Sequence, residues 1–457
     1  MISEADVVEW VYRQVAANGT EDQDMGQMEK AICGATRSLQ RQVLERLTQE
    51  AAAREELGCP NCGQTLTVVD RRRFRVVNSS FGPIRFMRSY GLCPHCQDYF
   101  FPADVALGLQ ERAPMSPRLQ EICAVMTLRA PAGQAEEDVR RLTSIDIAAS
   151  TLHREARRQG ERALKLRQKE EQLTEKPDGV ALLATKAPKL PAYSTLIIEI
   201  DAWNIRERDH WGHTEAMRNA GEDLERWHWV YTATVFRLDQ RGTTEAGRPI
   251  IADRGYVATR QGLESFKRQL YAEALQRGLL QAETVLVLGD GAAWIWNLAT
   301  EKFKNAEQRL DLYHAREHLC DLAGELYGKG TPEAQAWVQP YLRWLDQRKD
   351  GALDVIQSLD DLQHTINSFD EKQKAALNRE VAYLTTHKNR MDYKAAKKLG
   401  QPCGSGAIES TCSQYQRRFK LTGQFWSLAG DEAFLALSTL HRNRRWHLLF
   451  PHDTGKP

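Results

Sequence analysis

Residues 195–203 read Thr-Leu-Ile-Ile-Glu-Ile-Asp-Ala-Trp, a run of apolar and β-branched residues that reaches the acid Asp201. Such a short apolar run predicts a buried strand over residues 195–200, with Asp201 at its end. Because side chains alternate along a strand, Glu199 falls on the same face as Asp201 and is a rival for any role given to Asp201.

A second stretch has the same arrangement. Residues 284–294 read TVLVLGDGAAW, in which Asp290 follows a strand expected over residues 284–288. If the two strands are parallel neighbours, both carboxylates lie at the carboxyl edge of the sheet, where function in α/β proteins commonly gathers. The glycines on either side of Asp290 leave room for a metal and a phosphate to approach the backbone.

Strands and helices alternate around these two stretches, which is typical of an α/β domain. We expect further strands over residues 227–238, 248–253 and 309–312, and helices over residues 260–277, 314–327 and throughout 331–387. Residues 176–193 contain three prolines and no clear periodicity. This composition predicts a linker and the main domain boundary.

The part of the chain before this linker has a different pattern. Apolar residues near a period of 3.6 predict helix in residues 1–57. Residues 66–90 carry β-branched and aromatic runs around a turn at residues 79–83, which predicts a hairpin. Helical periodicity then returns over residues 116–173 and is broken twice, so we expect three helices there.

The composition is that of a soluble globular protein, with 42% hydrophobic and 27% charged residues among 457. This length favours about two to four domains. No apolar run approaches the length of a membrane span, and residues 1–10 do not resemble a signal peptide. We therefore expect a cytoplasmic protein.

The net charge is only +1, but basic residues cluster locally. The expected hairpin carries six arginines against the single acid Asp70, namely Arg71, Arg72, Arg73, Arg75, Arg85 and Arg88. A local positive field of this kind suits the phosphate backbone of DNA, so the hairpin, and Arg71, Arg72 and Arg73 in particular, is a candidate DNA clamp. Solvated helix and strand faces are the plainer explanation for other basic clusters.

Two C-x-x-C pairs enclose the hairpin: Cys59 with Cys62, and Cys93 with Cys96. Each pair forms a knuckle with two thiolates, and the returning hairpin brings the knuckles together into a tetrahedral zinc site. Protein ligands fill all four positions, so this zinc is expected to be structural. The alternative, disulfides or redox motifs, is disfavoured in a cytoplasmic chain.

Three short helices expected over residues 115–128, 133–142 and 147–159 have the spacing of a helix-turn-helix unit. The third helix would enter the major groove of DNA. It offers Arg154, Arg157 and Arg158, side chains able to contact bases and phosphates. Many three-helix units bind no DNA, and that alternative stays open.

A third acid follows far along the chain. Residues 404–410 read GSGAIES and begin a helix, with Ser405 as the expected N-cap and Glu409 one turn later. Three carboxylates supply the hard oxygen ligands with which two divalent ions cleave a phosphodiester bond. Each acid alone has a plainer explanation, as a turn residue or a helix-dipole partner. Asp209 and Asp253 are weaker candidates.

Four segments together resemble a known family: IEIDAW at 198–203, LGDGAAW at 288–294, DLYHAREHL at 311–319 and CGSGAIES at 403–410. They resemble the DDE transposases of bacterial insertion sequences, most closely the Kra-type group. The resemblance implies a ribonuclease H-like core whose acid triad, Asp201, Asp290 and Glu409, binds Mg²⁺ or Mn²⁺. It also implies a helical insertion before the last acid, at about residues 328–400.

The resemblance suggests further contacts with DNA. His314 would touch the scissile phosphate, although a histidine at a strand–helix junction is more often a local cap. Arg417 and Arg418 follow Glu409 and would track the DNA backbone. Three tryptophans, Trp203, Trp294 and Trp296, are candidates to stack on unpaired bases, with core packing as the more common alternative.

The fold expected from these observations is multidomain α/β. Its parts are an N-terminal helical region (1–57), a zinc ribbon (58–112), a helix-turn-helix domain (113–175), the linker (176–193) and a ribonuclease H-like catalytic domain (194–457). The expected function is a transposase that binds double-stranded element ends and target DNA in the bacterial nucleoid, as a dimer or higher assembly. The alternatives are a catalytically silent DNA-binding regulator and a nuclease that cuts without joining.

Overall fold

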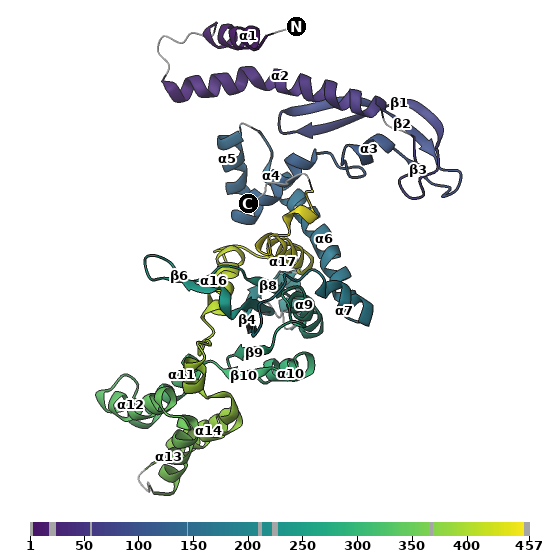
Figure 1. Ribbon diagram of the computed structural model, residues 1–457. Helices are drawn as coiled ribbons and strands as arrows, with labels where there is room; N and C mark the ends of the chain where they lie inside the picture. Colours follow the sequence, from purple (N-terminus) through teal and green to yellow (C-terminus); the bar gives the residue numbers. More distant parts are fainter. Residues whose placement is uncertain are drawn as a thin grey trace. The chain divides into compact units, whose positions relative to one another are not determined.

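The computed structural model describes residues 3–17, 24–54, 57–143, 145–208, 213–221, 227–365 and 369–451 (Figure 1). The chain is a mixed α/β protein with two compact units, Met1–Gln159 and Gly160–Pro457. The division falls inside the long helix α6 (Ala149–Leu173), not in the segment 176–193 where we expected it. That segment contains helix α7 (Pro177–Ala184), whose Leu183 is fully buried against α9 (Leu263–Gln276).

The first unit contains the expected hairpin, formed by the antiparallel strands β1 (Thr67–Ser79) and β2 (Gly82–Leu92). One face of the hairpin packs on helix α2 (Met25–Arg54), where Val77, Ile84 and Phe86 meet Leu44 and Ala52. The unit also holds α1 (Glu4–Ala16), β3 (Tyr99–Phe100) and α3 (Pro102–Ala106). Alternation of apolar residues along β1 and β2 therefore sets which face is covered.

Two of the six hairpin arginines hold the unit together and do not face solvent. Arg75 and Arg88 both form ion pairs with the buried carboxylate of Asp104 at the start of α3. Burial lowers the pKa of Arg88 to about 10, and the nearby charge of Arg75 acts in the same direction. These two arginines are therefore not available to a DNA clamp formed by the hairpin, because a buried acid neutralises them.

The expected three-helix unit follows as α4 (Pro117–Arg129), α5 (Ala132–Thr143) and the first part of α6. Their shared core includes Leu119, Cys123, Val139 and Leu152. Helix α6 runs on well past residue 159, where we expected the third helix to end.

The second unit is built on a five-stranded sheet with the order β10-β9-β4-β5-β8. The strands are β4 (Thr195–Arg206), β5 (Trp227–Arg237), β8 (Gly255–Thr259), β9 (Thr284–Gly289) and β10 (Glu307–Leu310). Strands β4, β5 and β8 are antiparallel, whereas β9 and β10 run parallel to β4. The two strands that precede or carry the candidate acids, β4 and β9, are thus parallel neighbours as expected.

One expected strand lies elsewhere. Residues 248–253 do not enter this sheet, because β7 (Pro249–Ile251) pairs with β6 (Arg241–Thr243) in a separate two-stranded ribbon. The third strand of the main sheet is β8, which directly follows that ribbon.

Helices cover both faces of the sheet. On one face α9 and α10 (Ala293–Lys302) pack against Ile198, Ile200 and Val287. On the other face α16 (Gly406–Phe419) lies against β4 and β5. The remaining helices are α8 (Thr214–Asn219), α11 (Leu312–Tyr327), α12 (Pro332–Gln347), α13 (Gly351–Thr365), α14 (Glu371–His387), α15 (Tyr393–Lys398) and α17 (Leu428–Arg442).

A group of helices stands between β10 and α16 in the sequence. Helices α11, α12, α13 and α14 pack on one another beyond the β9–β10 edge of the sheet (Figure 1). Their apolar faces belong to the same hydrophobic core as α9 and α10. The stretch that we expected to be helical is therefore one packed extension of the second unit.

The Asp104 arrangement yields a stability prediction. Asp104→Ala leaves Arg75 and Arg88 buried without a counter-charge, so the free energy of opening the β1–β2 hairpin should fall by about 3 kcal/mol. Hydrogen exchange of the hairpin amides in the whole chain measures this change. The matched control is Glu137→Ala, which removes an exposed ion pair with Arg141 at 2.7 Å and should lower the value by less than about 0.5 kcal/mol. Equal effects of the two substitutions would refute the structural role of Asp104.

Candidate metal centre and acid cluster

Asp201 lies inside strand β4 and not at its end. Strand β9 pairs with β4 only as far as Glu199, whereas β5 continues to pair with β4 as far as Arg206. Strand β4 continues beyond β9 because its backbone N–H and C=O groups still form hydrogen bonds with β5 along its other edge. The pairing of β4 with β9 ends at Glu199. The next residue of β4 that points toward α16 is Asp201.

Asp290 directly follows β9 in a tight turn. Its carboxylate accepts the N–H of Ala292 at 2.9 Å, and Gly291 has a φ of +102°, a conformation that favours glycine. The hydroxyl of Tyr383 on α14 donates to the backbone carbonyl of Asp290 at 3.3 Å. A Cβ at position 291 would come within 2.4 Å of that hydroxyl. The packed helices thus touch the turn that carries Asp290, and only glycine fits beside it.

Glu409 projects from the first turn of α16, as expected, but the helix is capped in an unexpected way. Ser405 occupies the N-cap position without a side-chain capping bond. Its hydroxyl and its N–H, the latter at 2.5 Å, donate instead to the carboxylate of Asp311. The N–H of Ile408 is bound by Glu199 on β4 at 2.8 Å.

This contact gives Glu199 a structural role that Asp201 does not share. Glu199 is 1% exposed, and burial raises its pKa to about 8. Its carboxyl group is engaged by the backbone of α16, so it fixes the helix in place. Of the weaker candidates, Asp253 pairs with Arg277 at 2.6 Å, and Asp209 lies outside the described residues.

The three candidate acids influence one another electrostatically. Burial raises the pKa of Asp201, and the charge of Asp290 raises it further. Burial also raises the pKa of Glu409, and the charge of Asp201 contributes in the same direction. His314 lowers both pKa values. The structure therefore gathers Asp201, Asp290, Glu409 and His314 in one neighbourhood.

The acids are spaced more widely than ligands around a single ion. Among the described residues, the one group of three or more His, Cys, Asp or Glu side chains whose ligand atoms all lie within 4.8 Å of one another is the cysteine cluster. Two features account for the wide spacing of the three acids. Their negative charges repel one another in the absence of a cation. A pair of ions roughly 3.5–4 Å apart also needs a wider set of ligands than a single ion does.

Asp311 is a site residue that sequence reasoning did not single out. It is 0% exposed and caps α11 by accepting the N–H groups of Tyr313 and His314. Its second oxygen binds Ser405, so one carboxylate joins the start of α11 to the start of α16. An aspartate just before a helix is an N-cap signal, but its long-range contact could not be read from the sequence.

His314 is 40% exposed, and its Nδ1 lies 3.5 Å from a carboxylate oxygen of Glu317. The side chain of His318, one turn later, binds Glu380 of α14 at 2.7 Å and stacks on the ring of Tyr383. Only His314 is therefore placed beside the acids, whereas His318 joins α11 to α14.

The three tryptophans proposed for base stacking are packed into the protein. Trp203 and Trp296 are 4% and 5% exposed, and the Nε1 of Trp203 donates to Thr232 at 3.0 Å. Trp294 packs edge-on against Tyr231. For the two buried rings the structure agrees with core packing, the more common alternative for tryptophans beside a strand end.

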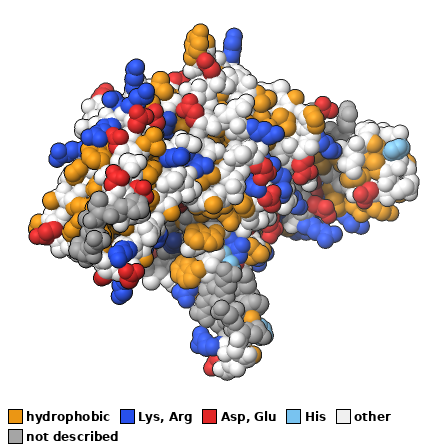
Figure 2. All heavy atoms as spheres, turned by 90° about the horizontal axis from the view of Figure 1, so that it is seen from below, with side chains coloured by type: hydrophobic (Ala, Val, Ile, Leu, Met, Phe, Trp, Pro, Cys, Tyr) orange, Lys and Arg blue, Asp and Glu red, His pale blue; other side chains and the backbone are white. Residues whose placement is uncertain are grey.

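The candidate DNA-binding arginines differ in exposure. Arg158 pairs with Glu155 at 2.8 Å, and burial lowers the pKa of Arg418, whose guanidinium lies 5.5 Å from the Trp426 ring, to about 10. The others are exposed: Arg71, Arg72, Arg73, Arg154, Arg157 and Arg417. Basic, acidic and hydrophobic side chains intermingle over the face shown in Figure 2. Positive charge that could attract DNA is therefore confined to small clusters of exposed arginines, since the net charge of the whole chain is only +1.

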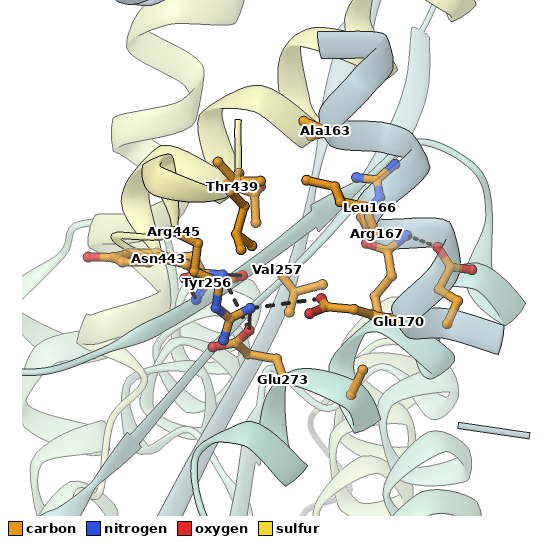
Figure 3. A pocket seen from close by; sticks show the side chains of 16 residues that line it. Ala163, Leu166, Arg167, Glu170, Tyr256, Val257, Glu273, Thr439, Asn443 and Arg445 are labelled. Carbon is orange, nitrogen blue, oxygen red and sulfur yellow. Dashed lines mark hydrogen bonds and ion pairs between the residues drawn. The ribbon is translucent and has the colours of Figure 1, made fainter. Parts of the chain in front are cut away.

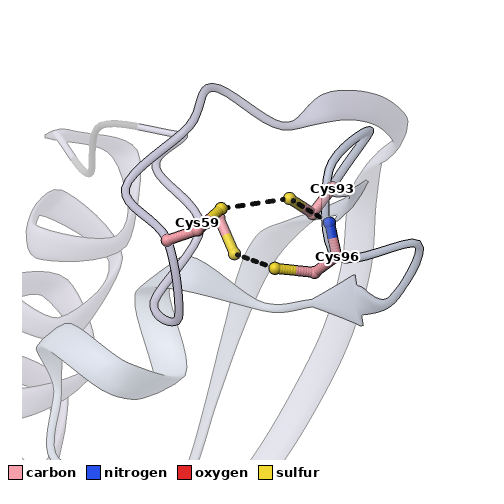
Figure 4. A group of neighbouring side chains, drawn as sticks. Cys59, Cys93 and Cys96 are labelled. Atoms are coloured by element: carbon pink, nitrogen blue, oxygen red, sulfur yellow. Dashed lines mark hydrogen bonds between the residues drawn. The ribbon is translucent and has the colours of Figure 1, made fainter.

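The four expected cysteines form a cluster that could hold zinc (Figure 4). Sγ of Cys59 lies 3.8 Å from that of Cys96, and Sγ of Cys62 lies 3.5 Å from that of Cys93. A tetrahedral zinc with Zn–S bonds near 2.3 Å requires S–S separations of about 3.8 Å. The donor set and its spacing therefore fit a metal ion.

The two knuckles have the same backbone design. Cys59 N–H binds the carbonyl of Gln64, and Cys93 N–H binds that of Asp98. Gly63 and Gln97, the residues after each second cysteine, both have positive φ, at 75° and 57°. The N–H of Cys96 lowers the pKa of Cys93 to about 7, which favours the thiolate that a metal needs.

A separate small pocket of about 60 Å³ lies between α6, β8, α9 and α17 (Figure 3). Its charged lining is already paired: Arg445 with Glu273 at 2.8 Å, and Arg167 with Glu432. Neither Asp201, Asp290 nor Glu409 lines it. We therefore regard it as part of the packing of the second unit.

Comparison with known proteins gives one distant relative to report. The chain is 24% identical over 387 residues to a protein of Streptococcus gallolyticus described as "UPF0236 protein in vanSb 3'region". The similarity covers 82% of this chain and 74% of that protein. No protein-family profile matches the chain. Among the described helices, none has the length and apolar character to cross a membrane.

The cysteine cluster predicts a bound metal. The purified protein should contain about one zinc ion per chain, and Cys62→Ser or Cys96→Ser should remove it because each deletes one of four ligands. Elemental analysis by mass spectrometry measures the stoichiometry. The control is Cys33→Ser, an exposed cysteine on α2, which should retain zinc. Zinc-free protein with two disulfides under non-reducing conditions would establish the redox alternative.

Proposed function

We propose that the chain is a DNA transposase that cleaves and joins DNA strands with two divalent metal ions held by Asp201, Asp290 and Glu409. The observation that carries the proposal is that three acids from widely separated parts of the sequence share one electrostatic neighbourhood. Asp201 comes from β4, Asp290 follows β9 and Glu409 lies on α16. Burial raises the pKa of Asp201 and of Glu409, and the charges of Asp290 on Asp201 and of Asp201 on Glu409 act in the same direction, which marks a candidate functional site.

The sheet supports a ribonuclease H-like core. Three antiparallel strands in sequence order, followed by two strands parallel to the first, place the carboxyl end of β9 beside Glu199, within β4. The helices α12, α13, α14 and α15 fall in the stretch where a helical insertion was expected from the resemblance. Fold alone does not define function, so the acids carry the argument.

The chemistry that suits these acids is phosphodiester cleavage and transfer. When bound, Mg²⁺ or Mn²⁺ activates the attacking oxygen and stabilises the leaving oxygen. The carboxylates of Asp201, Asp290 and Glu409 would hold the ions, and a bound cation would offset the repulsion between their charges. His314 acts electrostatically on Asp201 and Glu409, and we propose that it contacts the scissile phosphate.

DNA binding is assigned to the first unit and to exposed arginines. The β1–β2 hairpin offers Arg71, Arg72 and Arg73, and the three-helix unit offers Arg154 and Arg157. We propose that the protein acts on DNA in the bacterial nucleoid as a dimer or higher assembly, because transposition joins two element ends.

The central prediction concerns the acids. Asp290→Ala and Glu409→Ala should each reduce metal-dependent cleavage and strand transfer by at least about 1000-fold, a loss of about 4 kcal/mol in transition-state stabilisation. Labelled duplexes that carry the element ends, incubated with Mg²⁺ or Mn²⁺, measure both products. The matched control is Glu283→Ala, an exposed acid just before β9, which should retain activity.

The same assay separates the alternatives. Tight DNA binding by the unmodified chain without any cleavage would favour the silent regulator. Cleavage without a joined product would favour the nuclease. Full activity in the Asp290→Ala protein would overturn the proposed triad.

A further prediction tests the division of roles along β4. Glu199→Gln keeps an oxygen that accepts the Ile408 N–H, so activity should persist, whereas Asp201→Asn should abolish it. Glu199→Ala, which leaves that N–H unpaired, should lower the free energy of unfolding by about 1–3 kcal/mol. Thermal unfolding and the strand-transfer assay measure the two effects. Loss of activity in a stable Glu199→Gln protein would contradict this division of roles and would make Glu199 a candidate catalytic acid.

A further inference from the structure

Two tryptophans at the start of β5 are exposed, unlike the buried tryptophans of the core. Trp227 and Trp229 are 52% and 55% exposed. They alternate with His228 and therefore share one face of the strand, which is also the face of Tyr231. Tyr231 is covered by Phe266 of α9 and Trp294 of α10. Helices α9 and α10 thus cover this face of β5 as far as Tyr231, and the indole rings of Trp227 and Trp229 are exposed to solvent.

Guanidinium groups accompany these rings. Arg206 is the cross-strand partner of Trp227, and its guanidinium lies 5.8 Å from the Trp227 ring and 4.8 Å from the Phe425 ring. The guanidinium of Arg208 lies 4.7 Å from the same Phe425 ring. Phe425 is held there because the next residue pairs its backbone with β4, through Arg208 N–H to the Trp426 carbonyl at 2.7 Å.

The position of this surface relative to the acids is set by strand register. Trp229 pairs with Asn204, which lies three residues beyond Asp201 along β4. At about 3.3 Å per residue, the tryptophan pair begins roughly 10 Å from the Asp201 position along the strand. The rings lie on the face of this strand pair that α9 and α10 cover, whereas Asp201 lies on the α16 face, so they form a surface separate from the acids.

We propose that Trp227 and Trp229, with Arg206 and Arg208, form a stacking platform for unpaired bases of a DNA strand. Large aromatic faces bind successive bases of a single strand by stacking, without preference for sequence. The adjacent guanidinium groups attract its phosphates. Two flat rings on one exposed strand face, flanked by positive charge, match that ligand better than a duplex, whose bases are already stacked. The proposal rests on the proposed function for its class of ligand and adds a second surface for a DNA strand to the acid site.

The test measures binding of a labelled oligothymidylate by fluorescence anisotropy in the presence of EDTA, so that no cleavage is needed. Trp229→Ala should weaken binding about 10-fold, from the loss of one stacked base, and the Trp227→Ala/Trp229→Ala double variant should weaken it further. Trp229→Phe should restore most of the affinity because it keeps an aromatic face. The matched control is Tyr193→Ala, an aromatic residue of the same unit that is 86% exposed, and it should bind like the unmodified chain.

The outcomes separate this proposal from the function on which it rests. Unchanged oligothymidylate affinity in a folded double variant would overturn the platform, whatever the cleavage assay shows. Loss of self-association in the double variant with unchanged affinity would assign the surface to a second copy of the chain and would also overturn it. Weakened binding in a chain that never cleaves DNA would keep the platform and reject the transposase.

Discussion

The candidate site depends on how α16 is attached to the sheet. Glu409 follows Asp290 in the sequence only after the long helical stretch α11–α15, so no local preference fixes its position. Two buried carboxylates do so instead. Glu199 accepts the N–H of Ile408, and Asp311 accepts the N–H and hydroxyl of Ser405. These contacts satisfy donors at the start of α16 that the helix itself leaves unpaired.

This attachment explains why β4 carries two acids on one face with different roles. Glu199 lies where β9 still pairs with β4, and α16 covers it completely. Asp201 lies one strand period further, beyond the end of β9, where its carboxyl group meets Cys412 and the charge of Asp290. A buried acid that binds backbone N–H groups holds a helix in place. Asp201 is only partly buried, and it is the acid of this strand that we propose as a metal ligand.

The helical stretch has a structural role toward the site as well. Tyr383 contacts the turn of Asp290, and its ring stacks on His318, which in turn binds Glu380. Aromatic packing and a charge-assisted hydrogen bond thus connect α11, α14 and the turn. Together with Gly291, which alone fits beside the Tyr383 hydroxyl, they restrict the conformations open to Asp290.

The sequence by itself determined the local features. Cysteine spacing identified the metal cluster, apolar runs identified β4 and β9, and turn residues identified the hairpin, because each depends on near neighbours in the chain. Tertiary structure alone decided the rest. It buried Trp203 and Trp296 but exposed Trp227 and Trp229, paired Arg75 and Arg88 with Asp104, and separated Glu199 from Asp201. Side-chain burial and long-range pairing depend on which elements meet, and a single sequence pattern does not contain that information.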